Sequence, residues 1–246
     1  MKRKALLIGN SSGLSGVKID IANIKSFLIN DIGGLWDENE ILTFMNPSRL
    51  HLMSIVNRLK NEMIDYVIVY FSGHGAYERN TVLEINENEE YIYESDLRNI
   101  APRQLLIFDC CRNVISTPLF DSKTIRKSLL FGTTSNIRAY YDQRIMQSIE
   151  QQTSLYACSI NESSYDTNDG GIYTNCLLSS VLPSNGRDFK LVSEAQEEAR
   201  PKTFKMANDV YSGKQTPDQS IPKCMNSQQL IISINPSIAQ KSPIFG

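Results

Sequence analysis

Tyr66-Val67-Ile68-Val69-Tyr70-Phe71-Ser72-Gly73-His74-Gly75 is the stretch that decides the fold of this chain. Its first six residues are all aromatic or β-branched, which is typical of a strand that is buried on both faces. The run ends abruptly at a histidine between two glycines. We therefore predict a strand over residues 66–71 that leads into a loop carrying His74.

Similar apolar runs recur along the chain, and stretches of helical period lie between them. The short apolar runs, typical of strands, cover residues 5–9, 41–44, 105–108, 155–159 and 230–234. The stretches with helical spacing cover residues 17–28, 52–63, 172–182 and 191–211, and residues 81–85 with 91–93 favour a hairpin. Strands that alternate with helices predict an α/β fold, with a doubly wound, mostly parallel central sheet and helices on both faces.

Residues 113–153 interrupt this alternation, because they are polar and weakly periodic. We interpret them as a mobile connector that is accessible to proteolysis, within a single domain spanning residues 1–246. Residues 1–112 and 154–246 are then its two ordered parts. The basic residues of the connector, which are candidate sites of self-cleavage, are Lys123, Arg126, Lys127, Arg138 and Arg144.

Composition and charge exclude several classes of protein. The chain has 246 residues, of which 41% are hydrophobic and 21% charged, and this is a globular composition. Its 25 Lys and Arg against 27 Asp and Glu, a net charge of −2, argue against a nucleic-acid partner. No apolar stretch approaches the roughly 18 residues that span a bilayer, so we expect no membrane segment. The apolar run of the N-terminus stops at Ile8, too short for a signal peptide, and five scattered cysteines suit free thiols in the cytoplasm.

His74 and Cys111 each follow the carboxyl end of a predicted strand. In an open parallel sheet the reactive crevice lies at those ends, and neighbouring strands are about 4.8 Å apart. An imidazole there can hold a cysteine as thiolate for attack on a carbonyl and later protonate the leaving amine. The amides of Gly75 and Cys111 are our candidates for an oxyanion hole. The competing interpretation is that His74 is a turn residue and that the cysteines pack in the core.

These residues carry a resemblance to a known family. Residues 70–75 (YFSGHG) followed by residues 108–112 (FDCCR) resemble the caspase and metacaspase family of cysteine peptidases. The similarity extends to residues 14–20, 156–159, 170–174 and 215–217, and so covers nearly the whole chain. It implies a caspase-like fold, with His74 as general base and acid and Cys111 as nucleophile. Cys110 is expected to pack, because the family's nucleophile directly precedes the position of Arg112.

The sequence departs from the family pattern at two positions. Asn113 stands where a glycine usually follows the nucleophile, although asparagine tolerates a left-handed backbone. Leu14 stands where caspases that cleave after aspartate have an arginine, so cleavage after aspartate is not expected.

Metacaspases, which cleave after arginine or lysine, neutralise the substrate cation with acidic residues. In the corresponding loop, residues 160–166, this chain offers Glu162 and Asp166 as substrate-binding residues. A preference for basic residues is therefore expected. Asp20 is interpreted as a helix cap or structural partner, and Asp109 as a residue that orients backbone.

Neither a metal nor another cofactor is expected. The remaining cysteines lack the C-x-x-C spacing of zinc sites, and the sequence contains no EF-hand loop, although some metacaspases require calcium. The resemblance implies protein or peptide substrates and, by analogy, an activating ligand or partner chain and a regulated role in microbial defence or cell death. The alternative is a catalytically silent caspase-like module that binds partners, since Asn113 and the incomplete acidic pocket depart from the family. The sequence indicates no oligomeric state.

Overall fold

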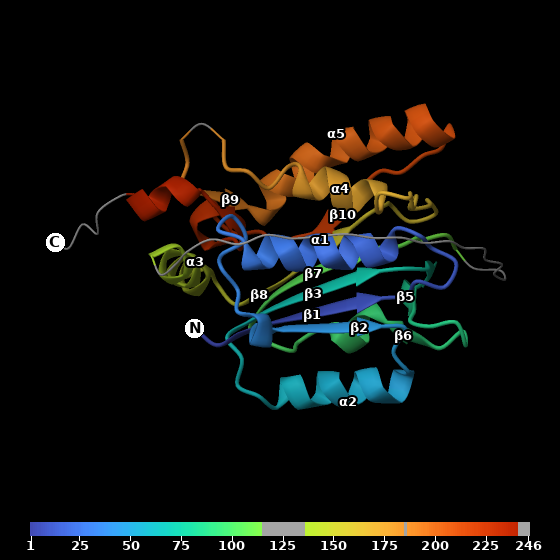
Figure 1. Cartoon of the computed structure of the whole chain (residues 1–246), viewed down its shortest axis with the longest axis horizontal. Coiled ribbons are helices and arrows are strands. Elements are labelled where there is room, and N and C mark those ends of the chain that lie inside the picture. Colours follow the sequence, from blue (N-terminus) through green and yellow to red (C-terminus); the bar gives the residue numbers. More distant parts are fainter. Residues whose placement is uncertain (115–135, 185, 241–246) are drawn as a thin grey trace.

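A six-stranded sheet forms the centre of the computed structural model, which describes residues 1–114, 136–184 and 186–240 (Figure 1). The strand order is β10-β8-β7-β3-β1-β2, and every neighbouring pair is parallel except β10 with β8. The strands are β1 (Arg3–Gly9), β2 (Ile41–Met45), β3 (Tyr66–Ser72), β7 (Arg103–Asp109), β8 (Gln151–Tyr156) and β10 (Asp218–Ser220). The predicted mostly parallel sheet is therefore confirmed.

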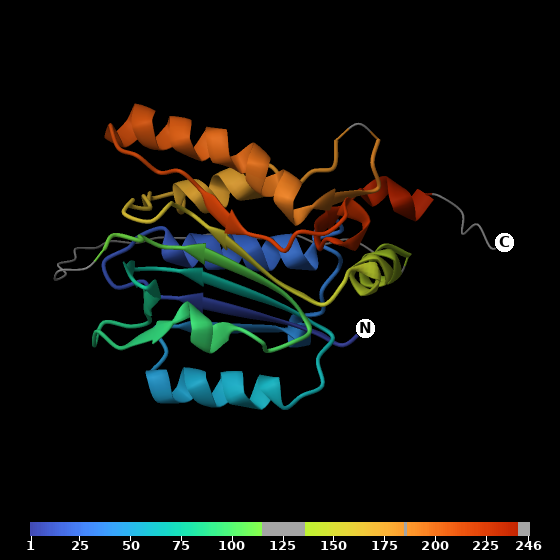
Figure 2. The same ribbon diagram turned by 180° about the vertical axis from the view of Figure 1, so that it is seen from behind.

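Helices cover both faces of this sheet, as predicted (Figures 1 and 2). On one face lie α1 (Val17–Ile29), α4 (Ile172–Leu178) and α5 (Val192–Tyr211), and on the other lies α2 (Arg49–Lys60). α1 buries Val17, Ile21, Ile24 and Leu28, the apolar stripe that recurs at helical spacing.

β3 joins two cores, one on each face of the sheet. Tyr66, Ile68 and Tyr70 pack in the core beneath α1, whereas Val67, Val69 and Phe71 pack in the core on the α2 side. All seven residues of β3 are buried. This double burial explains why the strand has no polar position before Ser72.

Two small sheets accompany the central one. β4 (Gly75–Glu78), β5 (Asn80–Glu84) and β6 (Tyr91–Tyr93) form an antiparallel sheet that begins directly after His74, and β9 (Phe189–Leu191) pairs with β11 (Ile231–Ile234). The short helical turns are η1 (Glu38–Glu40), η2 (Glu94–Leu97), η3 (Asn226–Gln228) and η4 (Pro236–Gln240). β10 was not predicted, because Asp218-Gln219-Ser220 has no apolar residue that would indicate a strand.

The prediction of an irregular connector over residues 113–153 is wrong for its second part. Residues 136–147 form α3 (Asn136–Gln147), and β8 begins at Gln151. α3 buries Ile137, Tyr141 and Ile145, an i, i+4, i+8 series whose sequence signal is diluted by polar neighbours. Arg138 and Arg144 therefore lie in a helix, whereas residues 115–135, with Lys123, Arg126 and Lys127, lie outside the described residues.

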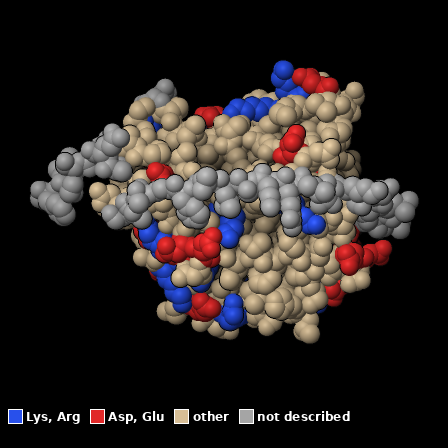
Figure 3. All heavy atoms as spheres, viewed as in Figure 1, with Lys and Arg blue, Asp and Glu red and all other residues tan. Residues whose placement is uncertain are grey.

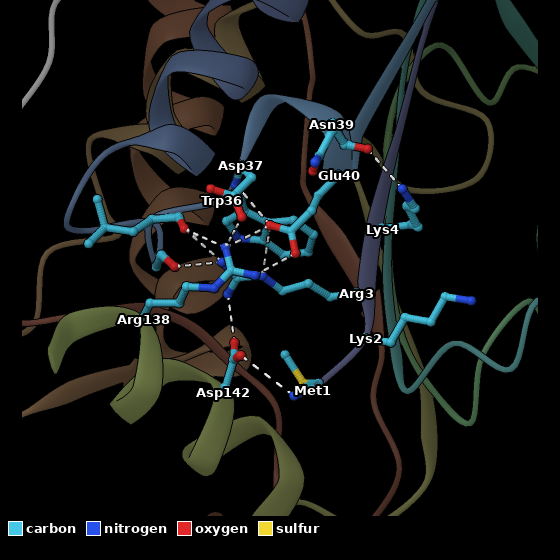
Figure 4. Close-up of polar contacts among 12 residues, drawn as sticks. Met1, Lys2, Arg3, Lys4, Trp36, Asp37, Asn39, Glu40, Arg138 and Asp142 are labelled. Atoms are coloured by element: carbon cyan, nitrogen blue, oxygen red, sulfur yellow. Dashed lines mark hydrogen bonds and ion pairs between the residues drawn. The ribbon is translucent and has the colours of Figure 1, made fainter. Parts of the chain in front are cut away.

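An ionic cluster holds α3 against β1 and η1 (Figure 4). The guanidinium of Arg3 lies 2.8 Å from Asp142 and 3.3 Å from Glu40, and Arg138 pairs with Glu40 from the other side. Arg3 also stacks over the ring of Trp36, with its guanidinium carbon 4.5 Å from the ring centroid. On the face drawn in Figure 3, acidic and basic side chains gather together at the end where Figure 1 places the N-terminus.

Among the described helices, none combines the length and the apolar composition that crossing a membrane requires.

Candidate active site

His74 and Cys111 both lie just beyond the carboxyl ends of neighbouring strands of the central sheet, at matching positions along the strand direction. β3 and β7 are parallel neighbours, and Ser72 is the register partner of Asp109. His74 and Cys111 are each the second residue after that pair, and they follow strands whose spacing is about 4.8 Å. The Gly73 amide extends the ladder by donating to the Asp109 carbonyl at 3.1 Å. An imidazole and a thiol at adjacent strand ends are the two groups that nucleophilic cysteine chemistry requires.

The ring of His74 is held by a backbone carbonyl. Its Nε2 lies 2.6 Å from the carbonyl oxygen of Ser12, and only 9% of the residue is exposed. Because a carbonyl oxygen can only accept, this bond requires hydrogen on Nε2 and makes Nδ1 the basic nitrogen of the neutral ring. Burial lowers the pKa of the His74 imidazole, and the bond to Ser12 opposes that change.

The thiol of Cys111 lies against the loop that follows β8. Its Sγ accepts from the Ser164 amide at 3.3 Å and lies 3.6 Å from the Ser164 carbonyl oxygen. Burial raises the pKa of the Cys111 thiol, whereas the Ser164 amide lowers it. A charge-stabilising partner such as an imidazolium would further favour the thiolate.

Cys110 points into the core instead. It is 2% exposed and packs in the core on the α2 side, while Cys111 is partly exposed. Burial raises the pKa of the Cys110 thiol well above its usual range. Of the two neighbouring cysteines, Cys111 is thus the one that a substrate could reach.

Gly75 lies directly against the segment that carries both cysteines. A Cβ at this position would lie 2.7 Å from the Cys110 Sγ and 2.9 Å from the Cys111 carbonyl oxygen. Only a glycine permits this approach, and it places the Gly75 backbone beside the proposed nucleophile.

Of the two acids predicted to bind substrate, Glu162 is engaged elsewhere. Its carboxylate lies 2.8 Å from the Lys214 ammonium and accepts from the Thr216 amide at 2.6 Å. These contacts fasten the loop to the segment before β10. Asp166 turns toward α1 instead, where it accepts from the Gly16 amide at 2.9 Å.

Two further acids, Asp20 and Asp109, form a buried pair that the sequence analysis treated as structural. Asp20 accepts from the Ser72 hydroxyl and from the Gly171 amide, both at 2.8 Å. Asp109 accepts from the hydroxyls of Thr174 and Ser164, at 2.7 and 2.6 Å. A Cβ on Gly171 would lie within 2.5 Å of Asp109 and 3.1 Å of Asp20, so both carboxyl groups converge there.

The pair has no cationic partner within 4 Å among the described residues. Burial raises the pKa of Asp20 well above its usual range, and the charge of Asp109 raises it further. Burial likewise raises the pKa of Asp109, against the lowering effect of its hydroxyl donors. Asp166 adds a third negative charge close enough to act on both. A cation close to this group would favour the ionised carboxylates and so oppose the rise in their pKa.

Ser164 connects this acid group to the thiol. Its amide donates to Cys111 while its hydroxyl donates to Asp109. One sequence signal could have identified the acids: Asp20 follows Val17 by three residues and so lies on the apolar stripe of α1, where a carboxylate is unusual.

No group of His, Cys, Asp and Glu suited to a metal ion exists in the part of the chain that the structure describes.

Comparison with known proteins adds family evidence to this geometry. The family model described as "Caspase domain" matches residues 2–224. No curated protein matches the chain.

Solved structures of the same fold are distant in sequence. A protein of Geobacter sulfurreducens superposes with a TM-score of 0.57 at 13% identity, covering 93% of this chain and 97% of its own. Caspase-1 from Spodoptera frugiperda gives a TM-score of 0.57 at 12% identity, covering 89% of this chain and 86% of its own. At these identities the likeness concerns the fold.

Proposed function

Because the chain belongs to the caspase-domain family, whose members are cysteine peptidases, we propose that it is a cysteine endopeptidase using His74 and Cys111. One observation carries the proposal: both residues follow the register pair Ser72 and Asp109 of adjacent parallel strands. Protein or peptide chains are the substrates.

The proposed reaction begins with proton transfer from the Cys111 thiol to Nδ1 of His74. The thiolate attacks the scissile carbonyl carbon, and the negative charge on the carbonyl oxygen is stabilised by the amides of Gly75 and Cys111. The imidazolium then protonates the leaving amine, which departs and leaves a thioester on Cys111. A water molecule, deprotonated by His74, attacks the thioester and releases the acid product.

We propose cleavage after lysine or arginine. The acid group of Asp20, Asp109 and Asp166 supports this preference, because it lacks a cation among the described residues and is joined to Cys111 through Ser164. Asp20 and Asp109 are buried, and Asp166 is partly exposed. We assign the substrate cation to Asp166 and the buried pair, and a loop-fastening role to Glu162, whose charge Lys214 already balances.

Further aspects of the role rest on analogy. Action in microbial defence or cell death, under control of a ligand or a partner chain, stays a prediction. The five cysteines are all free, which supports a reducing compartment such as the cytoplasm.

The test compares Cys111→Ala with Cys110→Ala on a panel of peptides that differ in the residue before the scissile bond. Cys111→Ala is expected to abolish cleavage and Cys110→Ala to retain it, with Lys and Arg peptides cleaved fastest. Equal cleavage by Cys111→Ala and the parent would overturn the assignment. Preference for another residue would remove the specificity proposal alone.

The catalytically silent module is the second candidate, because Ser164 contacts the Cys111 thiol on two sides and Asn113 replaces the family's glycine. A thiol-reactive peptide ketone separates the two. Labelling at Cys111 that requires His74 supports the peptidase, and absence of labelling together with absence of cleavage supports the silent module.

A further inference from the structure

We propose that Asn10 is a positioning residue that sets the proton-accepting geometry of His74 by holding the Ser12 carbonyl in place. This inference rests on the proposed function for its kinetic readout, and it concerns a residue that neither motif of the site contains. Asn10 is the residue directly after β1. It is fully buried, so each of its polar contacts is made with protein.

The side chain of Asn10 bridges two segments that flank His74. Its Oδ1 accepts from the Ser12 amide at 3.1 Å. Its Nδ2 donates to the Glu84 carbonyl at 3.0 Å and to the Glu84 carboxylate at 3.3 Å. Asn10 therefore ties the Ser12 loop to the last residue of β5.

Backbone hydrogen bonds around Asn10 also hold the segment that carries His74. The Asn10 amide donates to the Ser72 carbonyl at 2.9 Å, and the Glu84 amide donates to the His74 carbonyl at 3.1 Å. A Cβ on Gly73 would lie 2.9 Å from the Asn10 Cβ, so the histidine loop passes directly over this side chain. His74 is thus fixed at its backbone by Glu84 and at its ring by Ser12, and Asn10 joins both anchors.

This arrangement has a chemical consequence. The Ser12 carbonyl holds Nε2–H, and that bond selects the tautomer in which Nδ1 accepts the thiol proton. If Ser12 moves, the ring can rotate or change tautomer, and proton transfer loses its geometry. A misplacement of this kind costs on the order of 10- to 100-fold in rate.

Asn10→Asp is the sharpest variant, because it keeps the shape and the acceptor for Ser12 but replaces the donor. The ionised carboxylate would face the Glu84 carbonyl and carboxylate, and the protonated one could donate to them. Burial raises the pKa of Glu84, and the charge of Glu89 raises it further. The hydrogen bond from Asn10 lowers the pKa of Glu84. The titratable group on the Ser12 side of Asn10 is His74.

Kinetically, we expect Asn10→Asp to lower kcat about 10- to 100-fold at pH 8 with little change in KM. Its activity relative to the parent should recover as the pH falls to 6, because a proton restores the missing donor. Asn46→Asp is the matched control. The Asn46 side chain accepts from the amide of Ser11, which precedes Ser12 in the same loop, at 2.8 Å. The Asn46→Asp variant should therefore retain the parental kcat at both pH values.

A second readout does not depend on activity. The chain has two histidines, so NMR of histidine-labelled protein gives His74 with His51 as an internal reference. In Asn10→Ala we expect the Nε2-protonated tautomer of His74 to lose population and the pKa of His74 to fall, with His51 unchanged.

Equal kcat for Asn10→Asp and the parent at pH 8, or an equal loss in Asn46→Asp, would overturn the inference. An unchanged His74 tautomer in Asn10→Ala would do the same. A parent protein that cleaves no peptide would instead defeat the proposed function, and the NMR experiment would still decide the role of Asn10.

Discussion

Gly75 occupies a position in the site that has no room for a side chain. Its backbone packs against the side chain of Cys110 and the carbonyl of Cys111, and it begins β4 directly after His74. Both sides of this contact belong to strand ends that are fixed by the sheet. An added methyl group therefore displaces either the cysteine segment or the histidine loop.

We expect Gly75→Ala to lower kcat/KM at least about 10-fold while leaving the protein folded, because a shift of a few tenths of an ångström at this contact moves the nucleophile relative to His74. Peptide cleavage and thermal unfolding are measured together.

Gly186→Ala is the control for this substitution. A Cβ there meets nothing within 4 Å, although the backbone φ is +70°. The control should therefore cost only stability, about 1 kcal/mol. A fully active Gly75→Ala variant would show that the contact has no bearing on catalysis.

At the level of elements, α3 is held by an ionic cluster in addition to its buried apolar residues. Arg3 lies in β1, is 1% exposed, and contacts Asp142 of α3 and Glu40 of η1 (Figure 4). The guanidinium of Arg138 also holds Glu40, and these hydrogen bonds lower the pKa of Glu40 even though its burial raises it. The cluster joins the segment after residue 135 to the first strand of the chain.

We expect Arg3→Met to lower the free energy of unfolding by about 2–3 kcal/mol, because it removes the buried guanidinium and leaves Glu40 with Arg138 alone and Asp142 with the amino terminus at 3.8 Å. The measurement is urea unfolding at neutral pH.

Lys25→Met, which breaks the exposed pair with Glu38 at 3.5 Å, should cost less than about 1 kcal/mol. If both variants lost the same small amount, the cluster would contribute no more than a surface ion pair.

For the molecule as a whole, the acids beside the proposed nucleophile oppose folding at neutral pH. The folded-state pKa of Asp20 and of Asp109 is raised, so the folded protein retains protons at pH values where the unfolded chain releases them. Their contribution to stability is therefore most favourable below the unfolded pKa of about 3.9 and is lost as the pH rises through the folded-state values. A substrate cation would reverse this cost, which is consistent with a binding site.

We expect the stability of Asp20→Asn relative to the parent to increase between pH 4 and pH 7, by about 1–3 kcal/mol, because above the unfolded pKa the parent releases a proton from Asp20 on unfolding and the variant does not. Urea unfolding at a series of pH values gives the difference directly.

The same substitution at the exposed Asp169 should show no such trend. A difference that stays constant or decreases with pH would mean that Asp20 is stabilised as a carboxylate in the folded state.

The central elements, and the placement of His74 and Cys111 after neighbouring strands, were predictable from sequence. β3 is apolar at every position up to Ser72, and a strand buried on both faces admits little else, so its end and the position of His74 followed directly. Cys111 was favoured over Cys110 by family resemblance, since the apolar residues of β7 left the strand's parity undecided; in the structure Cys110 is the more buried of the two.

Other features depend on contacts between residues that are distant in the chain. β10 has no apolar residue and exists because β8 offers it a hydrogen-bonding edge. α3 is stabilised by Arg3, more than 130 residues away, and no local periodicity records that contact. Likewise, the ion pair of Glu162 with Lys214 and the proximity of Asp20 to Asp109 depend on the three-dimensional arrangement of the loops.

By itself, then, the sequence determined the alternation of strands and helices and the two strand ends that carry His74 and Cys111, because burial and period act locally along the chain. Only the tertiary structure decided which acids converge beside the thiol and which backbone carbonyl binds the ring of His74. Those relations depend on distances across the sheet, and the energies of buried charges and hydrogen bonds depend on partners that the linear order of residues does not reveal.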